Sequence, residues 1–180
     1  MLTVGIAQAE TQGDILHPGM TEKDIISSVK AMETSDGFSA QFWITTDEQV
    51  FVSWSQNTAI RELKPITEVK RNTPVYLALF MANPGVRRKS MSATSGRKIS
   101  DVTFDLFIIN PNGTLTLSNK QKVGWRGLPP APQLVYLAQD RGTLNFETID
   151  PLGEYTIVLI VHDNVRKVDM RLIRTLKLVD

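Results

Sequence analysis

The residues of this chain best suited to chemistry are the cations of a short segment, VRRKSMSATSGRK at 86–98. Five positive charges lie there without an acid: Arg87, Arg88, Lys89, Arg97 and Lys98. Such a cluster attracts an anionic partner, for example lipid headgroups, a polysaccharide or a nucleic acid. Single-strand binders interleave aromatic residues for stacking, and this segment has none, so we expect no specific nucleic-acid site. A solvated insertion is the alternative interpretation.

A second candidate contact segment is GWRGLPPAP at 124–132. A tryptophan in a proline-rich loop is a frequent anchor for a protein partner, which makes Trp125, with its neighbour Arg126, a candidate contact residue. The alternative is that the indole plugs the open end of the fold. We therefore predict that the five cations, Trp125 and Arg126 contact a partner, either a protein or an anionic component of the cell envelope.

Catalytic patterns are weak in this sequence. The two histidines are His17 and His162. His162 precedes Asp163, but neighbours on a strand point to opposite faces and cannot act together. There is no G-x-S-x-G elbow for a nucleophilic serine. Asp101 and Asp105 share a predicted strand face, yet no aromatic platform for a sugar accompanies them. We predict that the protein is not an enzyme.

Metal and cofactor patterns are equally weak. The chain has no cysteine, which excludes thiolate metal ligands and disulfides. Asp140, Asp150, Asp163 and Asn164 lie near predicted strand ends, where oxygen ligands could converge on calcium. Turn formation explains the same residues without a metal. We predict neither a metal nor a cofactor.

Composition and the N-terminus bear on location. Net charge is +1, and hydrophobic residues make up 42%, as in ordinary globular proteins. No apolar run approaches the roughly 18 residues that a membrane helix needs. Residues 1–9, MLTVGIAQA, end in an A-x-A form typical of signal-peptidase sites. We interpret 1–9 as a signal-peptide remnant and expect a periplasmic or extracellular protein; a first strand at 2–7 is the alternative.

The elements that would position these residues are mostly strands. Residues 10–37 form a polar extension, with either a helix at 21–33 or a linker. Alternating apolar residues at 38–54 predict a hairpin, and 75–82, apolar on both faces, predicts a central strand. Further strands are expected at 102–108, 114–123, 143–148, 155–162 and 168–178. The segments 86–98 and 124–132 are expected to be exposed loops, and Asn110-Pro111-Asn112-Gly113 a tight turn.

The stretch DPLGEYTIVLIV at 150–161 carries a resemblance to known domains. It is similar to the segment of immunoglobulin-like domains that forms the tyrosine corner, with Gly153 and Tyr155 in register and Ile157 where the cysteine would stand. Residues 38–180 also resemble a family of uncharacterised secreted bacterial proteins, and the C-terminal half resembles macroglobulin-like domains. The resemblance implies an all-β, immunoglobulin-like β-sandwich over 38–180, with Tyr155 at a corner and Ile157 in the core.

These observations favour a non-enzymatic binding or structural module of the bacterial periplasm or cell exterior. Two other classes stay open. A hydrolase or carbohydrate-active enzyme would need a concave pocket lined by His162 and at least two carboxylates. A subunit of an envelope assembly would present a free strand edge at 168–178 to a neighbour. An oligomer is compatible with the sequence.

Overall fold

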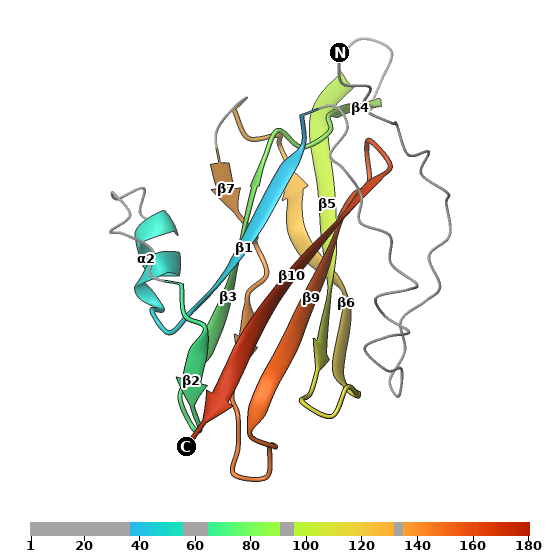
Figure 1. Cartoon of the computed structure of the whole chain (residues 1–180). Helices are drawn as coiled ribbons and strands as arrows, with labels where there is room; N and C mark the ends of the chain where they lie inside the picture. Colours follow the sequence, from blue (N-terminus) through green and yellow to red (C-terminus); the bar gives the residue numbers. More distant parts are fainter. Residues whose placement is uncertain (1–36, 56–64, 91–95, 132–134) are drawn as a thin grey trace, which may run out of the picture.

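The computed structural model describes residues 37–55, 65–90, 96–131 and 135–180. The predicted signal-peptide remnant at 1–9, the helix at 21–33 and nearly all of the polar extension lie outside these residues. The described chain folds as two β-sheets that pack face to face, with one short helix at the side (Figure 1). This confirms the predicted all-β sandwich.

The smaller sheet is built around β3 (Val75–Ala82). β1 (Ser39–Thr45) pairs with β3 on one side, while β7 (Val135–Leu137) and β8 (Gly142–Leu144) pair with it on the other. Seven of the eight residues of β3 are buried, because the strand has neighbours on both edges and packing on both faces. The central strand predicted from the sequence VYLALFMA is therefore confirmed.

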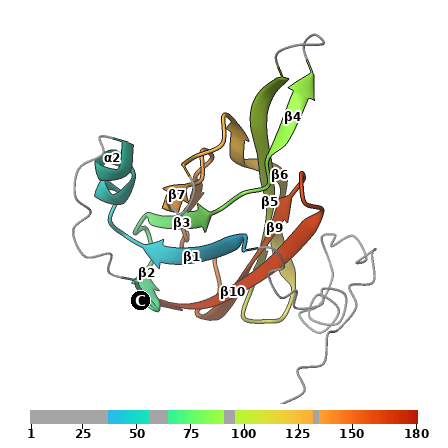
Figure 2. The same ribbon diagram turned by 90° about the horizontal axis from the view of Figure 1, so that it is seen from above.

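The larger sheet contains the remaining strands. Its order runs β2 (Glu68–Lys70), β10 (Val168–Val179), β9 (Gly153–Asp163), β5 (Gly96–Ile109) and β4 (Arg87–Ser90). β6 (Leu115–Gly127) also pairs with β5, after the predicted turn in which Gly113 has φ +76°. Figure 2 shows the two sheets end-on, with β1 and β3 facing β10 and β9 across the core.

The connectivity is that of an immunoglobulin domain. β1, β3 and the β7–β8 pair take the places of strands A, B and E, while β5, β9 and β10 take those of C, F and G. β6 extends the sheet beyond strand C, and the short β2 runs parallel to the last strand. The main core lies between the sheets and uses alternate residues of β9, namely Tyr155, Ile157, Leu159 and Val161.

The predicted tyrosine corner is present at the start of β9. The Tyr155 hydroxyl donates a hydrogen bond of 2.9 Å to the backbone oxygen of Pro151, and its ring packs on Phe146. The buried ring thus keeps its polar end satisfied. Gly153 has φ +133°, and a Cβ there would lie 2.9 Å from Pro111. Ile157 is fully buried, as expected.

The predicted hairpin over 38–54 is wrong in its second half. β1 forms as expected but pairs with β3, and residues Gln49–Ser55 form helix α2. Asp47 favours the helix because its Oδ1 accepts a 2.9 Å hydrogen bond from the Gln49 N–H, as a capping residue does. Val50 and Phe51 then pack against the outer face of β3, together with Trp43. The side chain of Trp54 lies outside the described set.

The outer face of β9 is partly covered by strands of its own sheet. β1 belongs to the opposite sheet and faces the main core. The outward residue Val158 instead lies in a separate apolar cluster with Phe107, Ile109 and Leu115 of β5 and β6. Residues of β5 and β6 therefore bury part of the outer face of β9, because residues two apart along a strand share a face.

Candidate functional site

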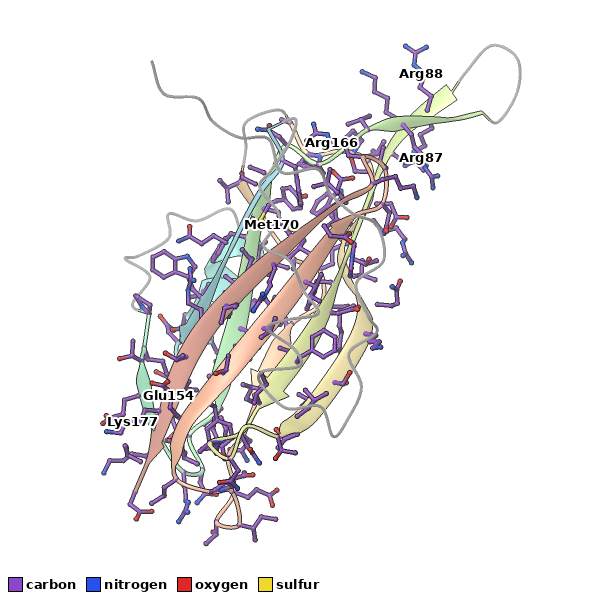
Figure 3. The ribbon with its side chains drawn as sticks, turned by 45° about the vertical axis from the view of Figure 1, so that its right-hand side comes forward. Arg87, Arg88, Glu154, Arg166, Met170 and Lys177 are labelled. Carbon is purple, nitrogen blue, oxygen red and sulfur yellow. The ribbon has the colours of Figure 1, made fainter. Side chains whose placement is uncertain are left out.

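The predicted loop at 86–98 is, in its described parts, an antiparallel ladder. β4 pairs with the first residues of β5, so that Arg87 stands opposite Ile99, Arg88 opposite Lys98 and Lys89 opposite Arg97. We call residues 87–90 and 96–99 the basic hairpin. It extends away from the body of the sandwich, with Arg87 and Arg88 on its surface (Figure 3). The prediction of a loop was wrong because β5 extends past the core. Its first residues pair there with the basic residues of β4.

The basic hairpin concentrates positive charge on its surface. Arg87, Arg88, Arg97 and Lys98 are all exposed. Within the described residues, none of the ion pairs involves any of these four cations. Like charges directly opposite one another on a sheet destabilise it. An anion bound between Arg88 and Lys98 would remove that repulsion, so the ladder favours anion binding.

A buried carboxylate holds the root of the basic hairpin. Asp163, at the end of β9, is 1% exposed and accepts a 2.6 Å hydrogen bond from the Gly85 N–H. Its other oxygen accepts from the N–H groups of Val165 and Arg166. The Ser100 hydroxyl donates to the Gly85 carbonyl at 2.7 Å. These bonds join the β9–β10 turn to the chain entering β4 and fix the direction in which the hairpin leaves the sandwich.

The root of the basic hairpin leaves no room for a side chain at position 85, which is a glycine. A Cβ at position 85 would lie 2.8 Å from Asp163 Oδ1 and 2.8 Å from Arg166 Cγ. Any side chain at position 85 would therefore push the Asp163 carboxylate away from the backbone N–H whose hydrogen bond it accepts. The glycine lets the backbone approach the buried acid closely.

A shallow hollow of about 310 Å³ lies at the base of the basic hairpin. Arg87 and Arg126 both line it, together with Ile99, Ser100, Asp101 and Gly127. Arg126 Nε is 3.2 Å from Asp101 Oδ1, which orients that guanidinium. Guanidinium groups offer planar forks of donors that match phosphate and carboxylate oxygens. The structure thus brings together two of the predicted contact residues from segments 39 positions apart.

Trp125 has a packing role in the structure. Its ring contacts Tyr136 edge-on at 4.9 Å, and its indole N–H donates to the Leu128 carbonyl at 2.8 Å. β6 continues through Trp125 to Gly127, so the loop expected at 124–132 begins only at Leu128, four residues later than predicted. This geometry agrees with the alternative interpretation, in which the indole plugs one end of the sandwich. Contact of Trp125 with a partner stays a prediction.

A charged cluster that sequence reasoning missed lies on the outer face of the larger sheet. His162 of β9 lies between two carboxylates, with Nδ1 2.7 Å from Asp169 Oδ1 on β10 and Nε2 3.6 Å from Asp105 Oδ2 on β5. The spacing of His162 and Asp169 in the sequence could have indicated this pair. A turn after Asp163 places 162 opposite 169 in an antiparallel hairpin, as the register shows. Asp163 itself points to the other face, as expected for sequence neighbours.

The cluster is electrostatically coupled. Burial lowers the pKa of His162, but the hydrogen bond to Asp169 and the negative charges of Asp105 and Asp169 outweigh it and raise the pKa to about 9. The pKa of Asp105 is lowered, although burial opposes the shift, because His162, the Gln121 N–H and Lys120 stabilise its anion. The imidazolium therefore carries a charge at neutral pH and is a poor general base. Neither described hollow is lined by His162.

Stability is expected to fall at alkaline pH through His162. Because its folded pKa lies above the ordinary 6.5, its stabilising contribution is complete below about pH 6.5 and is lost as pH rises through about 9. We expect a loss of about 1 kcal/mol after allowance for solvent screening, measured by urea unfolding at a series of pH values. His162→Gln should remove this slope. An unchanged slope in that variant would contradict the assignment.

The carboxylates considered for calcium already accept hydrogen bonds from backbone N–H groups. Asp140 Oδ2 accepts from the Val123 N–H, and Asp150 Oδ2 accepts from the Glu147 N–H. Asp163 is held at the hairpin root as described. In the part of the chain that the structure describes, no three His, Cys, Asp or Glu side chains are grouped so as to hold a metal ion. Asp101 and Asp105 likewise have separate partners, Arg126 and His162.

Comparisons with known proteins give no family. No family model matches the chain, and no curated protein matches it. A Niemann-Pick type C2 protein from the Japanese carpenter ant is structurally similar, with 11% identity and a TM-score of 0.43 over 79% of this chain and 91% of that one. A family 123 glycoside hydrolase from Clostridium perfringens matches with 9% identity and a TM-score of 0.36, over 79% of this chain and 28% of that one.

Likenesses this distant carry no argument about activity. The resemblance to secreted bacterial proteins is thus supported only at the level of an immunoglobulin-like β-sandwich, which rests on the strand connectivity and the tyrosine corner. None of the described helices is long and apolar enough to cross a membrane.

Proposed function

We propose that this protein is a non-enzymatic binding module of the bacterial periplasm or cell exterior, and that its basic hairpin binds an anionic envelope component, a surface of phosphate-bearing lipid headgroups. One observation carries the proposal. Four exposed cations stand on a ladder that extends from the sandwich, and no acid pairs with them in the described residues. Like charges that face each other on paired strands repel and destabilise the fold, and an anion bound between them relieves this repulsion.

The hollow at the hairpin base supports the same chemistry. Arg87 and Arg126 line it and offer forked donors to a phosphate group, while Asp101 orients Arg126. The root bonds to Asp163 keep the hairpin extended before any partner arrives, which lowers the ordering cost of binding. Export to the envelope is inferred from the A-x-A pattern at 7–9 alone and is tested by fractionating cells that express the complete gene. We assign no reaction to the chain.

Vesicle binding tests the proposal. The protein should sediment with vesicles that contain phosphatidylglycerol and not with vesicles of phosphatidylcholine alone. A variant with glutamine at positions 87, 88, 97 and 98 should bind roughly a thousandfold more weakly, because each cation near an anionic surface contributes about 1 kcal/mol. The matched control replaces Lys70, Lys120, Lys122 and Lys177 by glutamine, with the same loss of charge elsewhere.

The control separates local binding from net charge. The control variant should retain most of the affinity of the unmodified protein. Equal losses in the two variants would mean that overall charge decides binding, and equal sedimentation with both kinds of vesicle would mean that no anion is recognised. Either outcome would overturn the proposal.

A further inference from the structure

Two edge strands, β1 of the smaller sheet and β10 of the larger sheet, lie beside each other along one side of the sandwich. We call the strip between them the seam. Among the described residues, β1 pairs only with β3, and residues 168–176 of β10 pair only with β9. Figure 1 shows β1 and β10 running close together on the near side of the sandwich. β10 pairs with β9 through eleven positions in unbroken register and contains no proline. It has neither a bulge nor a proline at this edge, and the charge that it places among its core-facing positions is Arg174.

The chain itself uses one end of this seam. The Ile66 N–H donates to the Ile44 carbonyl of β1 at 2.8 Å, and the Lys177 N–H of β10 donates to the Thr67 carbonyl at 2.9 Å. β2 then runs parallel to β10 over three residues. One extended segment, 66–70, thus bonds first to the edge of one sheet and then to the edge of the other. The seam is able to hold a strand.

A groove of about 310 Å³ lies along the seam beside Pro65 and Ile66. Its walls come from both edges and from the segment before β2: Gln41, Phe42, Trp43, Ile44, Pro65, Ile66, Thr67, Arg174 and Thr175. Edge backbone groups alternate in direction along a strand. Since Ile44 and Lys177 direct theirs into the seam, the backbone groups of Phe42 and Thr175, two residues away, point into the groove as well.

The side chains of the groove indicate what would fill it. Ile66, which is only partly buried, gives an apolar surface at the groove, and the fully buried Phe42 lies behind it in the main core. The exposed Arg174 guanidinium lies 5.4 Å from the Phe42 ring centre and donates a 2.8 Å hydrogen bond to the Ile173 carbonyl, and it pairs with no acid in the described residues. Ile173 beside it is 37% exposed. An occupant with apolar residues and an acid at alternating positions would complement this surface.

We propose that this groove accepts an extended, acidic segment of a partner protein, which adds a strand to β10 in line with β2. Main-chain hydrogen bonds to the Ile173–Thr175 edge would give affinity, and Arg174 would select an acidic side chain. The site lies apart from the basic hairpin and does not depend on the function proposed for it.

The test uses a fluorescent synthetic peptide of alternating valine and glutamate, with a valine–lysine peptide as the control. The acidic peptide should bind, and hydrogen exchange should show added protection of the Thr175 amide. Thr175→Pro removes that amide from an outward position, which an edge strand tolerates, and should weaken binding at least tenfold. Thr175→Val keeps the amide and should bind as the unmodified protein does.

A second variant guards against misfolding. If Thr175→Pro alters the circular dichroism or the melting temperature, Arg174→Glu replaces it and should reverse the preference toward the lysine peptide. Three results would overturn the proposal: equal binding of both peptides, binding without protection of the Thr175 amide, or self-association of the chain through this edge in place of peptide binding.

Discussion

Replacing Asp163 by alanine is expected to lower the free energy of unfolding by about 3 kcal/mol, because three backbone N–H groups lose their acceptor. The Gly85 N–H suffers most. Its bond to Asp163 is the shortest of the three, and the carboxylate that accepts it is buried, so water replaces it poorly. Guanidinium unfolding followed by tryptophan fluorescence measures the loss.

Asp163→Asn is the matched control for this prediction. The amide retains one acceptor oxygen, so it should recover part of the lost stability while it cannot accept from Gly85 and from the β9–β10 turn equally well. Because the same bonds position the basic hairpin, Asp163→Ala should also speed exchange of the β4 amides. A loss below 1 kcal/mol would show that the root does not depend on this carboxylate.

Arg88→Glu is expected to change stability and binding in opposite directions. Position 88 faces Lys98 across the ladder, so the substitution replaces a like-charge pair by an opposite pair and should stabilise the fold by up to about 1 kcal/mol. Binding to phosphatidylglycerol vesicles should weaken by about 2 kcal/mol, roughly 30-fold, because two units of positive charge are lost at the surface. Urea unfolding and vesicle sedimentation measure the two effects.

The reciprocal substitution completes a double-mutant cycle. Lys98→Glu alone should behave as Arg88→Glu does, whereas the double variant restores a like-charge pair and should lose the gain in stability. Binding should fall further in the double variant. If stability and affinity changed together in all three variants, the charges would serve folding and not binding.

The strands with alternating apolar residues could be predicted from the sequence. β5, β9 and β10 were expected because apolar residues recur at period two between strong turn residues, and β3 was expected because its residues are apolar on both faces. α2 was missed because Val50, Val52 and Trp54 alternate within a segment too short to reveal a helical period. The basic hairpin was missed because its residues have no apolar face, and only the continuation of β5 makes them a ladder.

The residues of the candidate site could be predicted from the sequence, but their arrangement in space could not. The cations of the basic hairpin are visible as a cluster along the chain, and Arg126 was named for its place beside Trp125. That Arg126 and Arg87 line one hollow depends on the pairing of β6 with β5, which no local pattern reveals. The partners of His162 and the bonds of Asp163 depend in the same way on which strands become neighbours.

The length of β5 has a mechanical consequence. This single strand of 14 residues runs from the basic hairpin to Ile109 and pairs with β6 and β9 over its second part. A force applied to the hairpin by an attached surface would pull along β5. Hydrogen bonds in antiparallel ladders lie perpendicular to the strands, so such a pull loads many of them together in shear. A module attached through this hairpin would resist detachment by tension better than one attached through a flexible loop.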